Sequence, residues 1–262
     1  MLGLFITALL TILALFAGMI TPYPPSKIRV GEPFEPPNSD HLMGTDDLGR
    51  DIASGVIYGI RTALLIGVGT ASISAIIGIL VGVTSGFYGG KVDDLIMRAV
   101  DVFMAIPRFF LLLIIAAIMG ISIQNIIIVM AFLSWPMNVR LIRAEVLSVK
   151  ERPYVEAARA MGAGSAALMF REILPNSSAP LIINTFLEIG KAILLEASMS
   201  FLGLGDPVVP SLGKMLYNAQ AFFYSSWWMA VFPGLAILFT VLGLNLIGDG
   251  LNDALNPRIL VT

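Results

Sequence analysis

Six apolar stretches alternate with polar segments along the chain. They cover residues 2–20, 63–87, 95–119, 125–141, 179–198 and 229–247. An α-helix rises about 1.5 Å per residue, so about 20 apolar residues are needed to cross a hydrocarbon core of about 30 Å. The pattern therefore predicts an all-α membrane protein with six transmembrane helices. The first stretch lacks a basic start and a small-residue cleavage site, so we expect a helix there rather than a signal peptide.

Composition agrees with a membrane protein. The 262 residues are 57% hydrophobic and 13% charged, with a mean hydropathy of +0.87, whereas a soluble domain carries about 25% charged residues. Membrane lipid is thus an expected partner. The net charge of −2 argues neither for nor against a nucleic-acid partner, and we expect none. The lack of cysteine excludes disulfides and thiolate chemistry.

Loop charge orients the six predicted spans. An even number of spans puts both termini on one side, and Lys and Arg favour the cytoplasmic side. The termini and the loops on their side carry Lys91, Arg98, Arg140, Arg143, Lys150, Arg152, Arg159, Arg171 and Arg258, against Lys27, Arg29, Arg50, Arg61 and Lys214 opposite. We therefore predict cytoplasmic N and C termini. Residues 1–21 form the first helix, 22–60 an extracytoplasmic loop with a short helix, and 61–262 a core of five spans.

The outer loop is rich in proline and ends in the sequence HLMGTDDLGRD. Proline disfavours helix, and Thr45 is expected to cap a short helix that begins at Asp46. His41 is the only histidine. We expect it to be an exposed loop residue, because no second metal ligand lies nearby. The three aspartates of this stretch lack the spacing of a calcium loop, so we expect them on a solvated face.

Small and charged residues inside the predicted spans suggest how the helices pack. Gly78, Gly82 and Gly86 recur every four residues and share one face, which lets two membrane helices approach closely. Pro107 is expected to kink the third span.

Five charged residues inside the spans are candidates for a substrate path or for intramembrane ion pairs, because such charges rarely face lipid. They are Asp101, Arg108, Glu188, Lys191 and Glu196. Asp101 and Arg108 lie two turns apart on one face, and they either face the bundle interior or lie at its cytoplasmic edge. Glu188 and Lys191 lie three residues apart, so they either line the path or neutralise each other.

The segment at residues 156–176 interrupts this apolar chain. Its alanines favour a short helix at about 155–161, and Gly162, Gly164 and Ser165 predict a bend after it. Such a short helix does not hold its shape alone in water. We expect it to dock into a groove on a soluble partner and to transmit force.

Four motifs resemble the permease subunits of ATP-binding-cassette (ABC) importers. The first, Glu-Ala-Ala, then Gly, then Leu-Pro, comprises Glu156, Ala157, Ala158, Gly162, Leu174 and Pro175. Residues 41–51, 194–205 and 244–258 resemble segments of the dipeptide, oligopeptide and nickel branch. Two positions depart from the usual pattern, Glu172 where an apolar residue is usual and Leu212 where tryptophan is common.

This resemblance implies a type I importer permease fold in a prokaryotic cytoplasmic membrane. The first motif would be the coupling helix in the cytoplasmic loop at 151–176. The partners would be a homologous permease in a heterodimer, two ABC ATPase subunits and an extracytoplasmic solute-binding protein. The chain itself would be non-catalytic, with ATP and Mg²⁺ bound by the ATPases. Peptides are the expected cargo, and nickel and oligosaccharides remain alternatives.

Two other classes of protein are alternatives. An ion-coupled secondary transporter would use Asp101, Glu188 and Glu196 as ion sites, and it would work without ATPase subunits. An intramembrane enzyme would need His41, around which there is no nucleophile motif. Full transport by a His41→Ala variant would exclude that class. The Gly-Gly-Lys at residues 89–91 lacks the spacing of a phosphate-binding loop.

Overall fold

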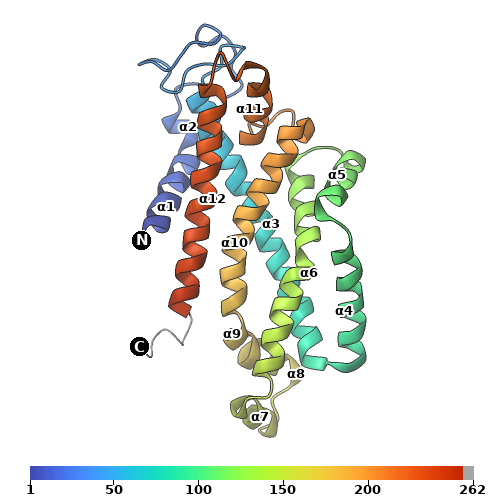
Figure 1. Ribbon diagram of the computed structural model, residues 1–262. Helices are drawn as coiled ribbons and strands as arrows, with labels where there is room; N and C mark the ends of the chain where they lie inside the picture. The colour runs from blue at the N-terminus through green and yellow to red at the C-terminus, as the bar shows by residue number, and fades with distance from the viewer. Residues whose placement is uncertain (256–262) are drawn as a thin grey trace.

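The structure is a computed structural model that describes residues 1–255, without the side chain of Ala116, as an elongated bundle of helices (Figure 1). Three helices are long and apolar enough to cross a membrane alone: α3 (Ile52–Tyr88), α6 (Ile123–Val149) and α12 (Trp228–Leu255). Two bent pairs also qualify. The expectation of an all-helical membrane protein is confirmed, with three to five candidate spans in the described chain.

The first predicted span is divided into two helices. α1 (Leu2–Leu15) and α2 (Ala17–Ile20) meet at Phe16, which interrupts the helix expected over residues 2–20. The 14 residues of α1 rise about 21 Å, which is less than the hydrocarbon thickness of a bilayer. α1 packs closely on α12, because Gly3 lies against Leu246 and Gly243 lies against Ile6.

Pro107 divides the third predicted span. α4 (Gly90–Ala105) and α5 (Arg108–Met119) meet there at an angle of 83°. Proline has no N–H to donate and its ring clashes with the preceding turn, so the break follows from the residue type. The predicted kink is confirmed.

The small face of α3 packs against α6, as the glycine spacing predicts. A Cβ added at Gly82 would lie 2.9 Å from Ile142 Cβ, and one at Gly86 would lie 2.8 Å from Val146 Cβ. Gly78 meets Asn138 at still closer range. Glycine at these positions therefore sets the distance between the two helices.

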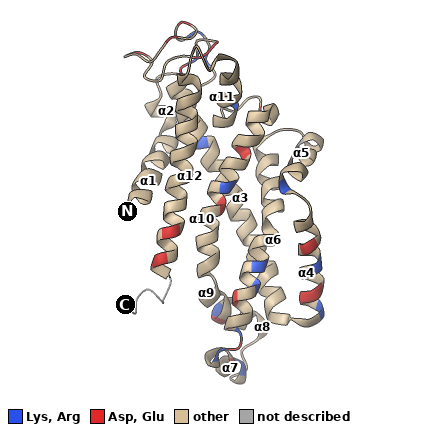
Figure 2. Ribbon diagram, in the orientation of Figure 1, with Lys and Arg blue, Asp and Glu red and all other residues tan. Residues whose placement is uncertain are grey.

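The two ends of the bundle differ in structure. The loop at 21–51 covers one end together with α11 (Leu212–Ala219) and η3 (Gln220–Phe222). The opposite end carries α7 (Pro153–Ala160), α8 (Ser165–Ala167), η1 (Leu168–Ile173) and α9 (Leu174–Ser177) (Figure 1). α10 (Ala179–Met199) continues into η2 (Ser200–Leu204) and returns toward the first end. Figure 2 shows that the charged residues of the long helices lie mainly toward the α7 end.

Candidate functional site

The helix α7 is held against the bundle by two side chains. Val155 and Ala158 are buried, and they pack in one apolar cluster with Val146 and Val149 of α6 and Ile173 of η1. The spacing of three residues puts Val155 and Ala158 on one helical face. Pro153 occupies the first turn, where a missing N–H costs nothing. This short helix is thus ordered by packing against its own chain.

The opposite face of α7 is open. Glu156, Ala157 and Ala160 are exposed, whereas Ala158 is buried. Leu174 is half-buried against the same apolar cluster, and Pro175 is exposed at the start of α9. Of the six predicted coupling residues, Ala158 and Leu174 therefore pack in the cluster that supports the helix, and Glu156 and Ala157 lie on its free face. Gly162 follows the C-terminus of α7, and Pro175 is exposed in α9.

The predicted bend after α7 is confirmed. Gly162 has φ +87°, a left-handed conformation that glycine adopts without strain. The N–H of Gly162 donates to the carbonyl of Arg159, and the N–H of Ala163 donates to that of Ala158. These two bonds close the C-terminus of α7 and turn the chain toward α8.

Glu188 lies in a buried polar cluster between α3, α6 and α10. The Asn138 side-chain amide donates to Glu188 Oε2 at 2.9 Å and to Ser74 Oγ at 2.7 Å. The Asn184 side-chain amide donates to the side-chain oxygen Oδ1 of Asn138 at 2.8 Å. Ser74 lies on α3 and Asn138 on α6, whereas Asn184 and Glu188 lie one turn apart on α10. The cluster therefore joins three helices.

The predicted pairing of Glu188 with Lys191 does not form. Glu188 turns inward to Asn138, whereas Lys191 is exposed and makes no salt bridge within residues 1–255. The buried Asn138 amide of the neighbouring helix donates a hydrogen bond to the Glu188 carboxylate, so this carboxylate does not need Lys191 as a partner. The Lys191 ammonium group stays at the surface.

Glu196 links α10 to the outer end of the bundle. Its Oε1 accepts from Ser200 Oγ at 2.6 Å and from Ser211 Oγ at 2.8 Å, and the residue is 2% exposed. Ser211 directly precedes α11. The contacts of this carboxylate therefore fit a structural role.

Asp101 and Arg108 do not share a helical face, because the break at Pro107 separates them. Asp101 instead pairs with Arg140 of α6, and both side chains are largely exposed. Arg108 is exposed at the start of α5. The spacing argument fails here because it assumes one continuous helix.

A partly buried ion pair that the sequence did not predict joins α4 to α6. Arg143 donates from Nε and Nη2 to the two carboxylate oxygens of Asp93, each at 2.5 Å. Ser85 of α3 donates to Asp93 Oδ1 at 2.5 Å. No sequence signal connects Asp93 and Arg143, because 50 residues separate them.

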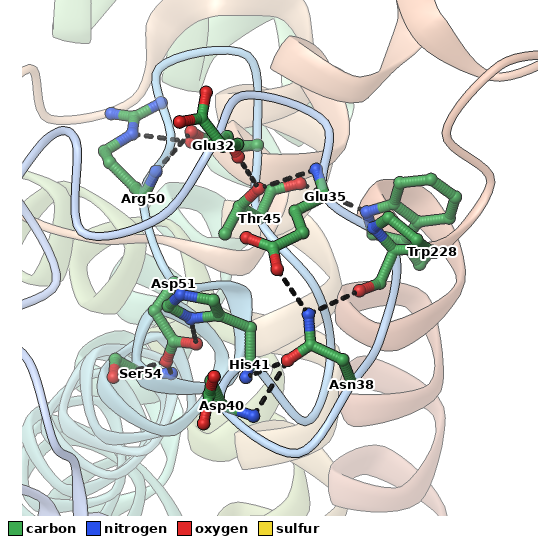
Figure 3. A network of polar contacts seen from close by, with 12 residues as sticks. Glu32, Glu35, Asn38, Asp40, His41, Thr45, Arg50, Asp51, Ser54 and Trp228 are labelled. Atoms are coloured by element: carbon green, nitrogen blue, oxygen red, sulfur yellow. Dashed lines mark hydrogen bonds and ion pairs between the residues drawn. The ribbon is translucent and has the colours of Figure 1, made fainter.

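His41 is buried in the outer loop, so the expectation of an exposed residue is wrong (Figure 3). Its Nδ1 lies 3.0 Å from Asp51 Oδ1. The other oxygen of Asp51 accepts from the Ser54 N–H at 2.7 Å and from Ser54 Oγ at 2.6 Å. The Ser54 hydroxyl bonds to the Asp51 carboxylate rather than to His41. His41 is therefore not placed to take the Ser54 hydroxyl proton as a catalytic base would.

The expected helix capped by Thr45 is also wrong, because α3 begins at Ile52 with Asp51 as its cap. Thr45 Oγ1 instead donates to the carbonyl of Glu32 and accepts from the N–H of Glu35 (Figure 3). Trp228 Nε1 donates to the Thr45 carbonyl at 3.1 Å, which ties the loop to α12. These distant partners outweigh the local capping preference.

The aspartates of the outer loop divide between the surface and the interior. Asp46 pairs with Arg50 at 2.6 Å, and Asp47 lies 3.9 Å from the same guanidinium. Asp51 is 5% exposed, so the expected solvated face is wrong for this residue. Its burial follows from its role at the start of α3.

A cavity of about 130 Å³ lies between the outer loop and α11. Arg50 and Lys214 contribute charged side chains to its lining. Burial and the nearby Arg50 charge lower the pKa of Lys214, while Asp206 opposes them. The Lys214 ammonium donates to the Pro207 carbonyl at 2.6 Å, so this cation holds the outer segment together.

Residues 74–261 match the family described as "Binding-protein-dependent transport system inner membrane component". The chain is 43% identical to the di/tripeptide transport system permease protein DppC of Pseudomonas aeruginosa, over 98% of this chain and 87% of that protein. It is 43% identical to the dipeptide permease DppC of Escherichia coli over 98% and 88%. It is 39% identical to the glutathione permease GsiD of Pectobacterium atrosepticum over 98% and 86%.

Solved structures agree in fold. A chain of the inward-facing MetNI methionine ABC transporter matches with a TM-score of 0.60 at 21% identity, over 77% of this chain and 96% of that one. A chain of an amino acid ABC transporter solved with histidines matches with a TM-score of 0.59 at 16% identity, over 78% and 95%. The described bundle thus has the fold of ABC importer permeases.

Proposed function

Because the chain belongs to the family of binding-protein-dependent transport inner membrane components, we propose that it forms half of the path of an ATP-driven peptide importer. As a member of this family it is a multi-pass permease of the bacterial inner membrane and a non-catalytic subunit. The names of the relatives support a di- or tripeptide cargo over nickel or an oligosaccharide.

In the proposed assembly the chain has six spans with both termini in the cytoplasm. α1 with α2, and each of the two bent pairs, would count as one span beside the three long helices. This topology puts α7 in the cytoplasm and the loop at 21–51 outside. Arg258, one of the charges that support it, lies outside the described residues.

The proposed partners follow from the family, and the topology assigns each of them to one side of the membrane. A homologous permease would complete the path within the membrane. Two ATPase subunits would bind ATP and Mg²⁺ at the cytoplasmic face, and a solute-binding protein would deliver the peptide at the outer face. The family description itself supports a binding-protein partner.

The observation that carries the proposal is that one face of α7 is buried and the other is exposed. Val155 and Ala158 join the helix to the bundle, while Glu156, Ala157 and Ala160 remain exposed at the tip (Figure 1). A helix that is fixed on one face and free on the other suits a surface that another subunit grips. When ATP closes the ATPases, their contacts with this face change, which is what a shift between inward and outward opening requires.

The test uses the complete complex in vesicles, with uptake of a labelled dipeptide and ATP hydrolysis measured together. Glu156→Lys reverses an exposed charge on the free face of α7. Gly162→Val forces a β-branched residue into a left-handed conformation. We expect the dipeptide transported per ATP to fall by about 5-fold or more, the range of typical coupling energies.

Two matched variants control for general damage. Glu151→Lys makes the same charge change at an exposed residue just outside α7. Gly164→Val places the same side chain at φ −70°, where no described atom lies within 4 Å of an added Cβ. Both should keep the wild-type ratio. Unchanged coupling in both test variants would refute the role of α7, and uptake without ATPase subunits would instead indicate a secondary transporter.

A further inference from the structure

Asp93 is the point where three helices meet near the α7 end of the bundle. Its carboxylate accepts two bonds from Arg143 of α6 and one from Ser85 of α3, and Asp93 itself lies in the first turn of α4. Asp93 is 8% exposed. Two parallel N–H···O bonds from one guanidinium fix both distance and orientation, so α4 cannot rotate against α6 without breaking them.

A second ion pair joins the same two helices but differs in setting. Asp101 and Arg140 have side-chain exposures of 63% and 44%, against 12% and 30% for Asp93 and Arg143. Exposed pairs contribute little to rigidity, because few neighbouring atoms hold the two long side chains and fixing them in one geometry costs conformational entropy. The inner pair is therefore the stiff connection between α4 and α6.

Arg143 lies on the same stretch of α6 as the apolar contacts of α7. Val146 and Val149 pack in one cluster with Val155 and Ala158 of α7. At the C-terminal end of α6, Lys150 donates to the carbonyl of Gly86 at 3.1 Å, and Gly86 also packs on Val146. Packed side chains thus run from α7 through α6 to the Asp93 carboxylate.

We propose that Asp93 and Arg143 act as positioning residues that pass a displacement of α7 to α4 and so to the bent α4–α5 pair. The inference rests on the proposed function, since it needs an ATPase that moves α7. α4 and α5 meet at 83° at Pro107, so a displacement of α4 changes the angle between the two helices. The ion pair makes α4 follow α6, whereas apolar contacts alone would let the helices slide.

The experiment measures dipeptide uptake and ATP hydrolysis in the same vesicles, normalised to the amount of assembled complex. Asp93→Asn and Arg143→Gln each remove one partner, and Arg143→Lys keeps the charge but loses the two-point bond. Each should keep ATP hydrolysis while the dipeptide transported per ATP falls by about 2- to 30-fold, the range for residues within a coupling network. The exchanged pair Asp93→Arg with Arg143→Asp should recover part of this loss.

Arg140→Gln is the matched control, because it breaks the exposed pair between the same helices. It should leave the ratio at the wild-type value. A merely structural role would lower the amount of complex and leave the ratio unchanged in every variant, and that result would overturn the inference. An equal fall in Arg140→Gln would overturn it too. Failure of the proposed function itself would show in the wild type, as uptake that does not depend on ATP.

Discussion

At the scale of single residues, Asp51 shows how one side chain can organise a whole loop. It caps α3 through Ser54 and also holds the only histidine of the chain in the interior (Figure 3). A buried carboxylate is stable only when its oxygens are bonded, and here both are. The start of a 37-residue helix and the fold of the preceding loop therefore depend on the same group.

We expect Asp51→Ala to destabilise the protein by about 1–3 kcal/mol, because the helix cap is lost and His41 is left buried without its partner. The measurement is the unfolding temperature of the purified protein in detergent. Asp40→Ala removes an exposed aspartate from the same loop and should leave that temperature unchanged. Equal unfolding temperatures for the two variants would contradict the role assigned to Asp51.

At the scale of elements, the contact between α3 and α6 sets the geometry of the bundle. Glycines on α3 bring the backbones close, and this approach places Asn138 between Ser74 and Glu188. Close backbone contact and a buried polar cluster therefore depend on each other. A change in helix separation would leave the Glu188 carboxylate without its amide donor.

The same substitution at two helical glycines tests this contact. Gly78→Ala places a methyl group against Asn138, so we expect a loss of about 1–3 kcal/mol from overpacking. Gly234→Ala, in α12, meets no described atom within 4 Å, and alanine is the better helix former there by up to about 1 kcal/mol. Thermal unfolding in detergent should rank Gly234→Ala at or above wild type and Gly78→Ala below it. The reverse order would be inconsistent with a close α3–α6 contact.

At the scale of the whole molecule, the exposed Lys191 suggests which side of α10 faces away from lipid. It is exposed in the middle of a span, and a lysine there costs about 2.5–3.5 kcal/mol when it faces hydrocarbon. In the proposed assembly this cost would be avoided, because α10 would line a water-filled path beside a second permease. The exposed Lys191 is therefore our best candidate for a pathway residue of this chain.

We expect Lys191→Met to keep or raise the stability of the complex and to lower dipeptide uptake, while Lys191→Arg keeps the charge and most of the uptake. Leu194→Met, at an exposed position one turn further along α10, serves as the control and should transport normally. Uptake and thermal unfolding are measured on the same preparations. Normal uptake with higher stability in Lys191→Met would instead place this lysine against lipid.

The sequence by itself determined the features that depend on neighbouring residues. Apolar runs predicted membrane helices, Pro107 predicted the break between α4 and α5, and Gly162 predicted the turn after α7. The spacing of Gly78, Gly82 and Gly86 also predicted a close helix contact. This prediction did not require the partner helix to be known, because the small face is formed within one helix. Local sterics and hydrophobicity decide each of these.

Only the tertiary structure decided which side chains meet. Asp93 and Arg143, or Asn138 and Glu188, lie 50 residues apart, and their pairing depends on how the helices pack. The same holds for His41, whose buried ring bonds to the Asp51 carboxylate at the start of α3. A charged group buried in a bundle bonds to whichever donor the packing brings within reach, and spacing along the chain carries no information about that donor.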